Sequence, residues 1–179
     1  MRRKLGITVL GVLLGITIAG VARADDDEKD DKNGRTILAF STMYGVDGPF
    51  LNSTQVRGVL GDEAPWVVGR VSGFLKKDGH LDIQVKGLVF KNDPTLVPPD
   101  KIGINDEPTF RGLVSCLIEA GPHQVGIVNL TTGEFPATPT GNSHIDAQLH
   151  LPDQCIAPIV FVLAGSEDKW FSVTGVELK

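Results

Sequence analysis

Short stretches of alternating apolar and polar residues recur along this chain, separated by segments rich in glycine and proline. A repeat of two residues is typical of a β-strand with one buried face, and many such strands indicate an antiparallel sandwich or barrel. The sequence therefore predicts an all-β fold, an antiparallel β-sandwich in a single domain. The predicted strands are 36–43, 55–60, 66–76, 80–90, 109–118, 124–131, 143–151, 158–164 and 169–177. The proline-containing connections 92–108 and 135–142 are expected at the surface.

The clearest predicted unit is a hairpin over 66–90. A three-residue loop at 77–79 pairs Leu75 with Leu81 and brings the apolar side chains of both strands to one face. A two-residue turn would mix polar and apolar side chains, since a slip of one residue turns a strand inside out. The pattern therefore predicts a type I turn with Gly79 in a left-handed conformation.

The segment 109–118 fits two kinds of secondary structure. Its apolar residues follow helical spacing, and they also alternate as in a strand. We favour the strand because Gly112 weakens a helix and the neighbouring segments are strands.

The stretch HIDAQLH contains two of the four histidines of the chain. In a strand, His144 and Asp146 share a polar face and lie close enough to hold one metal ion. His150 lies about 20 Å further along the strand and cannot join them. Zinc requires three or four ligands, so we predict a solvent-exposed face without a structural metal. His80 or His123 from another strand would be needed to complete a site.

Three aromatic residues are candidate ligand-binding residues. Trp66 and Phe90 are expected on the outer face of the hairpin, and Trp170 on the polar face of the last strand. Exposed aromatic rings can stack on a sugar or dock a protein. The alternative is that a neighbouring segment covers them.

The chain contains two cysteines, Cys116 and Cys155. In an exported protein, such a pair normally forms a disulfide. The bridge would tie strand 109–118 to the start of strand 158–164. A catalytic thiol is the alternative, but it needs a histidine partner and leaves the second cysteine unexplained.

The first residues have the pattern of a secretory signal peptide. A basic start precedes an uncharged apolar run, and Ala22-Arg23-Ala24 fits a cleavage site before Asp25. We therefore predict a signal peptide at 1–24, a disordered acidic leader at 25–34 and the β-domain at 35–179. An uncleaved membrane anchor is the alternative for 1–24.

Charge and motifs exclude several functions. Removing 1–24 removes four positive charges and no negative ones, so the net charge changes from −5 to −9. A nucleic-acid partner or an anionic membrane would require a basic surface, and the sequence has no basic stripe, so we predict neither partner after signal cleavage. The chain has no G-x-S-x-G motif and no glycine-rich phosphate loop. We therefore predict no catalytic residue and no cofactor.

Two stretches, FPATPTGNSHIDAQLHLPDQCIAPIVFV and KWFSVTG, resemble an uncharacterised family of secreted bacterial β-rich proteins. With the hairpin and FRGLVSC, the resemblance covers most of 36–176. DGHLDIQVKGL is similar to chordin-type (CHRD) extracellular modules, although their paired-histidine motif is not evident here. These resemblances imply an immunoglobulin-like or CHRD-like sandwich, and they imply no known activity.

The expected function is that of a secreted, non-enzymatic interaction or envelope-associated module that binds a protein or a glycan. One alternative is a metal-dependent extracellular enzyme that uses the histidines. Another is a carbohydrate-binding module that uses Trp66 or Trp170.

Overall fold

The structure is a computed structural model that describes residues 34–175. The predicted signal peptide, all but the last residue of the predicted leader and the end of the predicted strand 169–177 lie outside these residues. Residues 34–175 form twelve strands and one short 3-10 helix. The elements are β1 Thr36–Phe40, β2 Tyr44–Gly45, η1 Gly48–Phe50, β3 Leu60–Gly61, β4 Trp66–Val67, β5 Arg70–Lys76, β6 His80–Lys86, β7 Val89–Phe90, β8 Thr109–Gly121, β9 Gln124–Pro136, β10 Ser143–Gln148, β11 Ile156–Ala164 and β12 Lys169–Val173.

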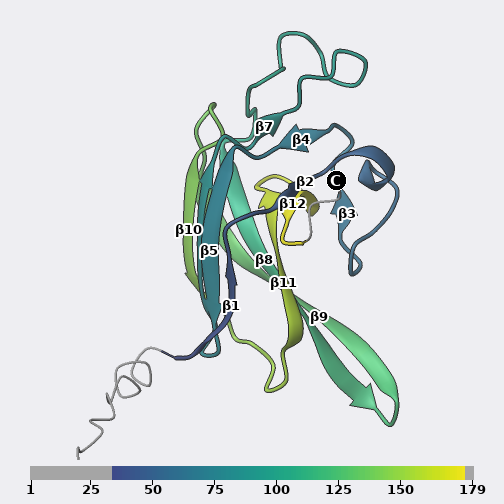
Figure 1. Cartoon of the computed structure of the whole chain (residues 1–179), viewed down its shortest axis with the longest axis vertical. Coiled ribbons are helices and arrows are strands. Elements are labelled where there is room, and N and C mark those ends of the chain that lie inside the picture. Colours follow the sequence, from purple (N-terminus) through teal and green to yellow (C-terminus); the bar gives the residue numbers. More distant parts are fainter. Residues whose placement is uncertain (1–33, 176–179) are drawn as a thin grey trace, which may run out of the picture.

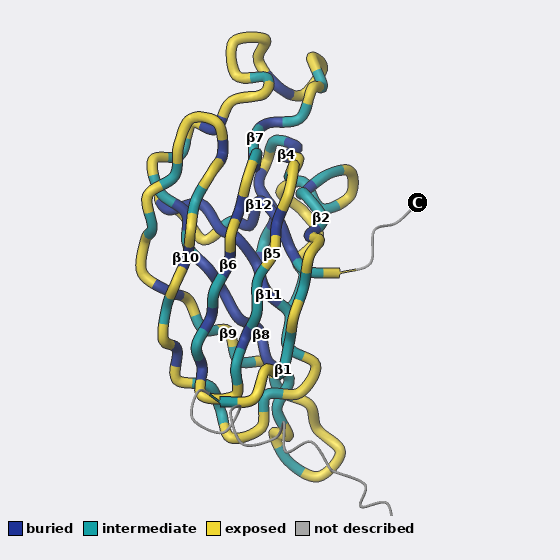
Figure 2. Tube along the Cα trace, turned by 60° about the vertical axis from the view of Figure 1, so that its left-hand side comes forward, coloured by how far each residue is buried: buried dark blue, intermediate teal, exposed yellow. Residues whose placement is uncertain are grey.

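The strands form two packed sheets, which confirms the predicted all-β sandwich. Sheet A has the order β1-β5-β6-β10, and sheet B has the order β2-β12-β11-β8-β9, with β3 parallel to β12. The short pair β4–β7 lies at one end of the sandwich (Figure 1). Buried positions are concentrated along the strands, whereas the loops at both ends are mostly exposed (Figure 2).

The two sheets approach closely at Gly112 of β8. A Cβ atom at this position would lie 3.0 Å from the side chain of Leu81 and 3.3 Å from that of Ile145. Both of these residues belong to sheet A and are fully buried. Glycine is needed here because a side chain on sheet B would push the sheets apart.

The predicted hairpin register is confirmed. Leu75 pairs with Leu81 and Val71 pairs with Val85, so the apolar side chains share the inner face of sheet A. Gly79 has a φ of +94°. A Cβ atom there would lie 1.9 Å from a carbonyl oxygen of Leu149, so both conformation and space require glycine.

The hairpin strands are shorter than predicted. Each is interrupted where the backbone amide of Gly69 donates a hydrogen bond to the carbonyl of Gly87, whose φ is +70°. This break shifts the inward–outward alternation by one residue. Trp66 is buried and Val67 is exposed, the reverse of what an unbroken strand requires.

Two further predictions concern single segments. The predicted strand 55–60 is wrong over most of its length, because Arg57 and Gly58 adopt positive φ and form a tight turn. A bridge between Val56 and Val59 closes this turn. The preference for a strand over 109–118 is confirmed, and β8 continues to Gly121.

Candidate functional site

The outer face of β6 and β10 carries two histidines and two aspartates. Strand β10 pairs antiparallel with β6, and Asp146 lies directly opposite Asp82. Alternation directs Ile83 and Ile145 into the core and their neighbours outward. The predicted polar face of the HIDAQLH stretch is therefore confirmed.

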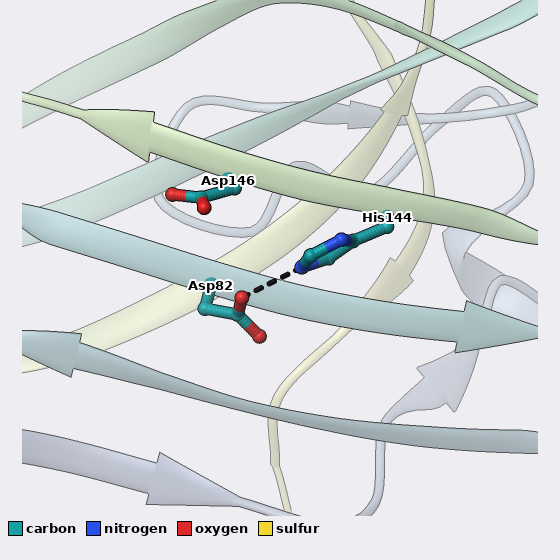
Figure 3. A group of neighbouring side chains, drawn as sticks. All are labelled: Asp82, His144 and Asp146. Carbon is teal, nitrogen blue, oxygen red and sulfur yellow. Dashed lines mark hydrogen bonds and ion pairs between the residues drawn. The ribbon is translucent and has the colours of Figure 1, made fainter.

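Each histidine of this face contacts the aspartate on the other strand. Nε2 of His144 lies 2.7 Å from Oδ2 of Asp82, and Nε2 of His80 lies 3.0 Å from Oδ1 of Asp146. Asp82, His144 and Asp146 offer ligand atoms that lie within 4.8 Å of one another. Figure 3 shows these three side chains, with His144 reaching from β10 to Asp82. We call His80, Asp82, His144 and Asp146 the His/Asp cluster.

The sequence prediction had only part of this cluster. His144 and Asp146 were identified, and His80 was named as a partner that could complete a site. Asp82 was missed, although His80 and Asp82 follow the same alternation. His123 lies in the turn between β8 and β9, outside the cluster.

The predicted disulfide is present. Cys116 of β8 is bonded to Cys155, which directly precedes β11, and the two are separated by 39 positions. Cys116 is fully buried, and no free cysteine occurs in the described residues. The alternative of a catalytic thiol is therefore wrong for both cysteines.

The prediction of exposed aromatic patches is wrong. Trp66, Phe90 and Trp170 are 2%, 7% and 0% exposed. The Trp66 ring stacks on Phe171 with 3.9 Å between centroids and packs on Phe90 at 4.2 Å. Phe50 of η1 packs on Trp170. None of these rings offers a flat open surface to a sugar.

A small cavity of about 340 Å³ lies beside these rings. Trp66 and Phe90 contribute to its wall together with five carboxylate side chains. The carboxylate residues are Asp62, Glu63, Asp106, Glu107 and Glu167.

Asp62 is the buried carboxylate of this cavity. Its Oδ2 accepts a hydrogen bond of 2.8 Å from the indole Nε1 of Trp66. Burial raises the pKa of Asp62 to about 6, although the indole donor acts in the opposite direction. Lys169 forms ion pairs with Glu63 and Glu167, and the bond from Lys169 lowers the pKa of Glu63. The ammonium group of Lys169 therefore already neutralises part of the negative charge at this cavity.

The raised pKa of Asp62 predicts a specific pH dependence of stability. As the pH rises, the unfolded chain releases the proton of Asp62 near pH 3.8, whereas the folded protein keeps it until about pH 6. The contribution of Asp62 to the free energy of unfolding should therefore fall by about 2 kcal/mol from pH 4 to pH 7. Urea unfolding of the wild type and of Asp62→Asn at several pH values should show this change in their difference.

The control for this experiment is Asp93→Asn. The hydroxyl and amide of Thr95 donate to the carboxylate and lower the pKa of Asp93, so its contribution should have the opposite sign. A wild-type minus Asp62→Asn difference that stays constant with pH would contradict the prediction.

The β8–β9 hairpin forms a ribbon that extends beyond the rest of the sandwich (Figure 1). Leu117 pairs with Ile127 on one side and with Ile156 on the other, so these side chains form a row across three strands. Ile127, Ile156 and the nearby Val125 are 50%, 52% and 72% exposed. We call Leu117, Val125, Ile127 and Ile156 the ribbon patch.

The free edge of this ribbon is strand β9. It is the last strand of sheet B, and no described strand pairs with its outer edge. The segment 124–133 contains neither a charged residue nor a proline. Sheet edges in soluble proteins are usually protected by charge, by proline or by a covering segment.

The described residues contain no helix with the length and hydrophobicity of a transmembrane segment. The chain matches no protein-family model, no curated protein and no solved structure. The resemblances to secreted bacterial proteins and to CHRD modules stay predictions.

Proposed function

We propose that this protein is an exported, non-enzymatic interaction module that self-associates through the β9 edge and the ribbon patch. The observation that carries the proposal is the uncharged stretch 124–133 of the edge strand β9 beside three exposed apolar side chains. The partner in this proposal is a second copy of the chain.

Export is supported by the sequence and by the disulfide. The pattern of residues 1–24 is that of a signal peptide. Disulfides persist in oxidising compartments such as the periplasm and the extracellular space. The bridge between Cys116 and Cys155 fits such a location.

The chemistry of the edge favours pairing with another strand. An exposed edge strand presents backbone N–H and C=O groups that can bond to an added strand. In β9 the residues flanking these groups are apolar or uncharged over 124–133. The ribbon patch would supply apolar area next to the new backbone hydrogen bonds.

The β9 edge is a place where two acidic copies of the chain can meet without opposing charges of the same sign. After removal of residues 1–24 the net charge is −9, so two copies repel each other over most of their surfaces. Antiparallel pairing of two β9 strands within 124–133 places no charged residues opposite each other. A twofold dimer of this kind uses the same patch on both copies.

Analytical ultracentrifugation tests the proposal. We expect the wild-type domain, with EDTA present, to form dimers within a concentration range up to about 1 mM. The variant Val125→Lys/Ile127→Lys should weaken dimerisation at least about tenfold, because charges at a sheet edge oppose pairing. Both positions are exposed, so circular dichroism should show an unchanged fold.

The matched control is Val67→Lys/Leu96→Lys. These side chains are also exposed and apolar, but they lie outside the ribbon. The control should dimerise as the wild type does. A wild type that stays monomeric throughout, or a dimer unaffected by the ribbon variant, would overturn the proposal.

A further inference from the structure

We propose that the His/Asp cluster on sheet A binds one divalent transition-metal ion of the zinc class. The ligands are Asp82, His144 and Asp146, and His80 positions Asp146 from outside the ligand set. This site is independent of the ribbon and of the proposed self-association.

The first argument is the chemistry and spacing of the ligand atoms. Imidazole nitrogen and carboxylate oxygen are ordinary ligands of Zn²⁺, with bonds of about 2.1 Å and therefore about 3.4 Å between ligands of a tetrahedral site. The candidate atoms of Asp82, His144 and Asp146 lie within 4.8 Å of one another. These partly exposed side chains need to move by only about 1 Å to reach that spacing.

The second argument is electrostatic. Asp82 and Asp146 face each other directly across β6 and β10, an arrangement that destabilises a sheet when both are ionised. Within residues 34–175, their ion-pair partners are His144 and His80. A neutral imidazole forms hydrogen bonds but supplies no positive charge. A divalent cation between the carboxylates supplies that charge.

The third argument is that the backbone holds the ligands in place. The ligands lie on two paired strands whose inward residues Leu81, Ile83 and Ile145 are fully buried. On the other side of β6, Phe74 pairs with Asp82 and packs edge-on against the His80 ring at 5.3 Å. Sites built on packed strands hold their geometry better than sites on loops.

His80 has the position of a supporting residue. Its Nε2 contacts Oδ1 of Asp146 at 3.0 Å, which leaves Oδ2 for a metal ion. Groups that hydrogen-bond to a ligating side chain orient it and tune its affinity.

The acid cluster of Asp62, Glu63 and Glu167 differs from the His/Asp cluster because a lysine is paired with it. It also offers three ligand atoms within 4.8 Å. However, Lys169 forms ion pairs with Glu63 and Glu167 and already neutralises them. Among residues 34–175, no lysine or arginine forms an ion pair with Asp82 or Asp146.

Calorimetric titration of the untagged, exported chain with Zn²⁺ tests this proposal. We expect saturable binding of one ion per chain and its loss in Asp82→Asn/His144→Ala. The His80→Gln variant should bind about tenfold more weakly, as expected for a supporting residue. Co²⁺ should give the visible absorption of a tetrahedral site in the wild type and not in the double variant.

The controls are His123→Ala and His150→Ala, which remove the two histidines outside the cluster and should bind Zn²⁺ as the wild type does. Absence of saturable Zn²⁺ binding would overturn the proposal. Zn²⁺ binding that persists unchanged in the double variant would overturn it as well, because other acidic residues would then hold the metal. Binding of Ca²⁺ as tight as that of Zn²⁺ would contradict the ligand class, since Ca²⁺ prefers six to eight oxygen ligands.

Discussion

Replacing Trp66 by alanine is expected to lower the free energy of unfolding by about 4 kcal/mol, a typical value for truncation of a core aromatic residue. The ring stacks on Phe171 and packs on Phe90, so its loss opens a cavity between sheet B and the β4–β7 pair. The buried carboxylate of Asp62 also loses the indole donor. Urea unfolding at pH 7 measures the effect.

Two variants separate these contributions. Trp66→Phe keeps an aromatic ring and removes the indole N–H, so it should lose less stability than Trp66→Ala. Val67→Ala changes the neighbouring exposed residue and should stay within about 0.5 kcal/mol of the wild type. A loss below about 1 kcal/mol for Trp66→Ala would show that the ring is not part of the core.

Reducing the Cys116–Cys155 disulfide is expected to lower the free energy of unfolding by about 4 kcal/mol, because the bridge closes a loop of about 40 residues in the unfolded chain. For a domain of this size, the corresponding fall in the melting temperature is roughly 10–15 °C. Thermal unfolding with and without a thiol reductant measures it. Reduction leaves both side chains in place and therefore isolates the bond itself.

The control for the reductant is a Cys116→Ala/Cys155→Ala variant, whose melting temperature should be low and unaffected by reduction. A wild-type melting temperature that does not change on reduction would contradict a stabilising bridge.

The disulfide also lies at the base of the proposed interface. Cys116 precedes Leu117 within β8, and Cys155 precedes Ile156, the first residue of β11, so the bond ties β8 to the start of β11 beside the ribbon patch. Reduction should therefore weaken dimerisation as well as stability, if the ribbon patch is the interface. The ultracentrifugation experiment with reductant provides this second measurement.

Local patterns in the sequence were sufficient to predict the register of the β5–β6 hairpin. The pairing of Leu75 with Leu81 and the left-handed Gly79 follow from alternation and loop length, because a slip in register would place apolar side chains in water. The disulfide was also predictable, since the two cysteines of a chain with a signal-peptide pattern have one intramolecular partner each.

The burial of the aromatic residues was not predictable from local pattern. The hydrogen bond between Gly69 and Gly87 interrupts the hairpin and shifts its alternation, so Trp66 turns inward. The burial of Trp170 depends on a segment far away in sequence, because the Phe50 ring packs on the Trp170 ring.

The amino-acid sequence by itself determined which side chains of β6 and β10 face the core, because in these strands that choice depends on a repeat of two residues and on the hydrophobic effect. It therefore placed His144 and Asp146 on one exposed face. Only the tertiary structure decided that β10 pairs with β6, since a nonlocal strand neighbour is chosen by the packing of the whole sandwich. That pairing brings Asp82 and His80 to His144 and Asp146, and it turns half of a metal site into the cluster proposed above.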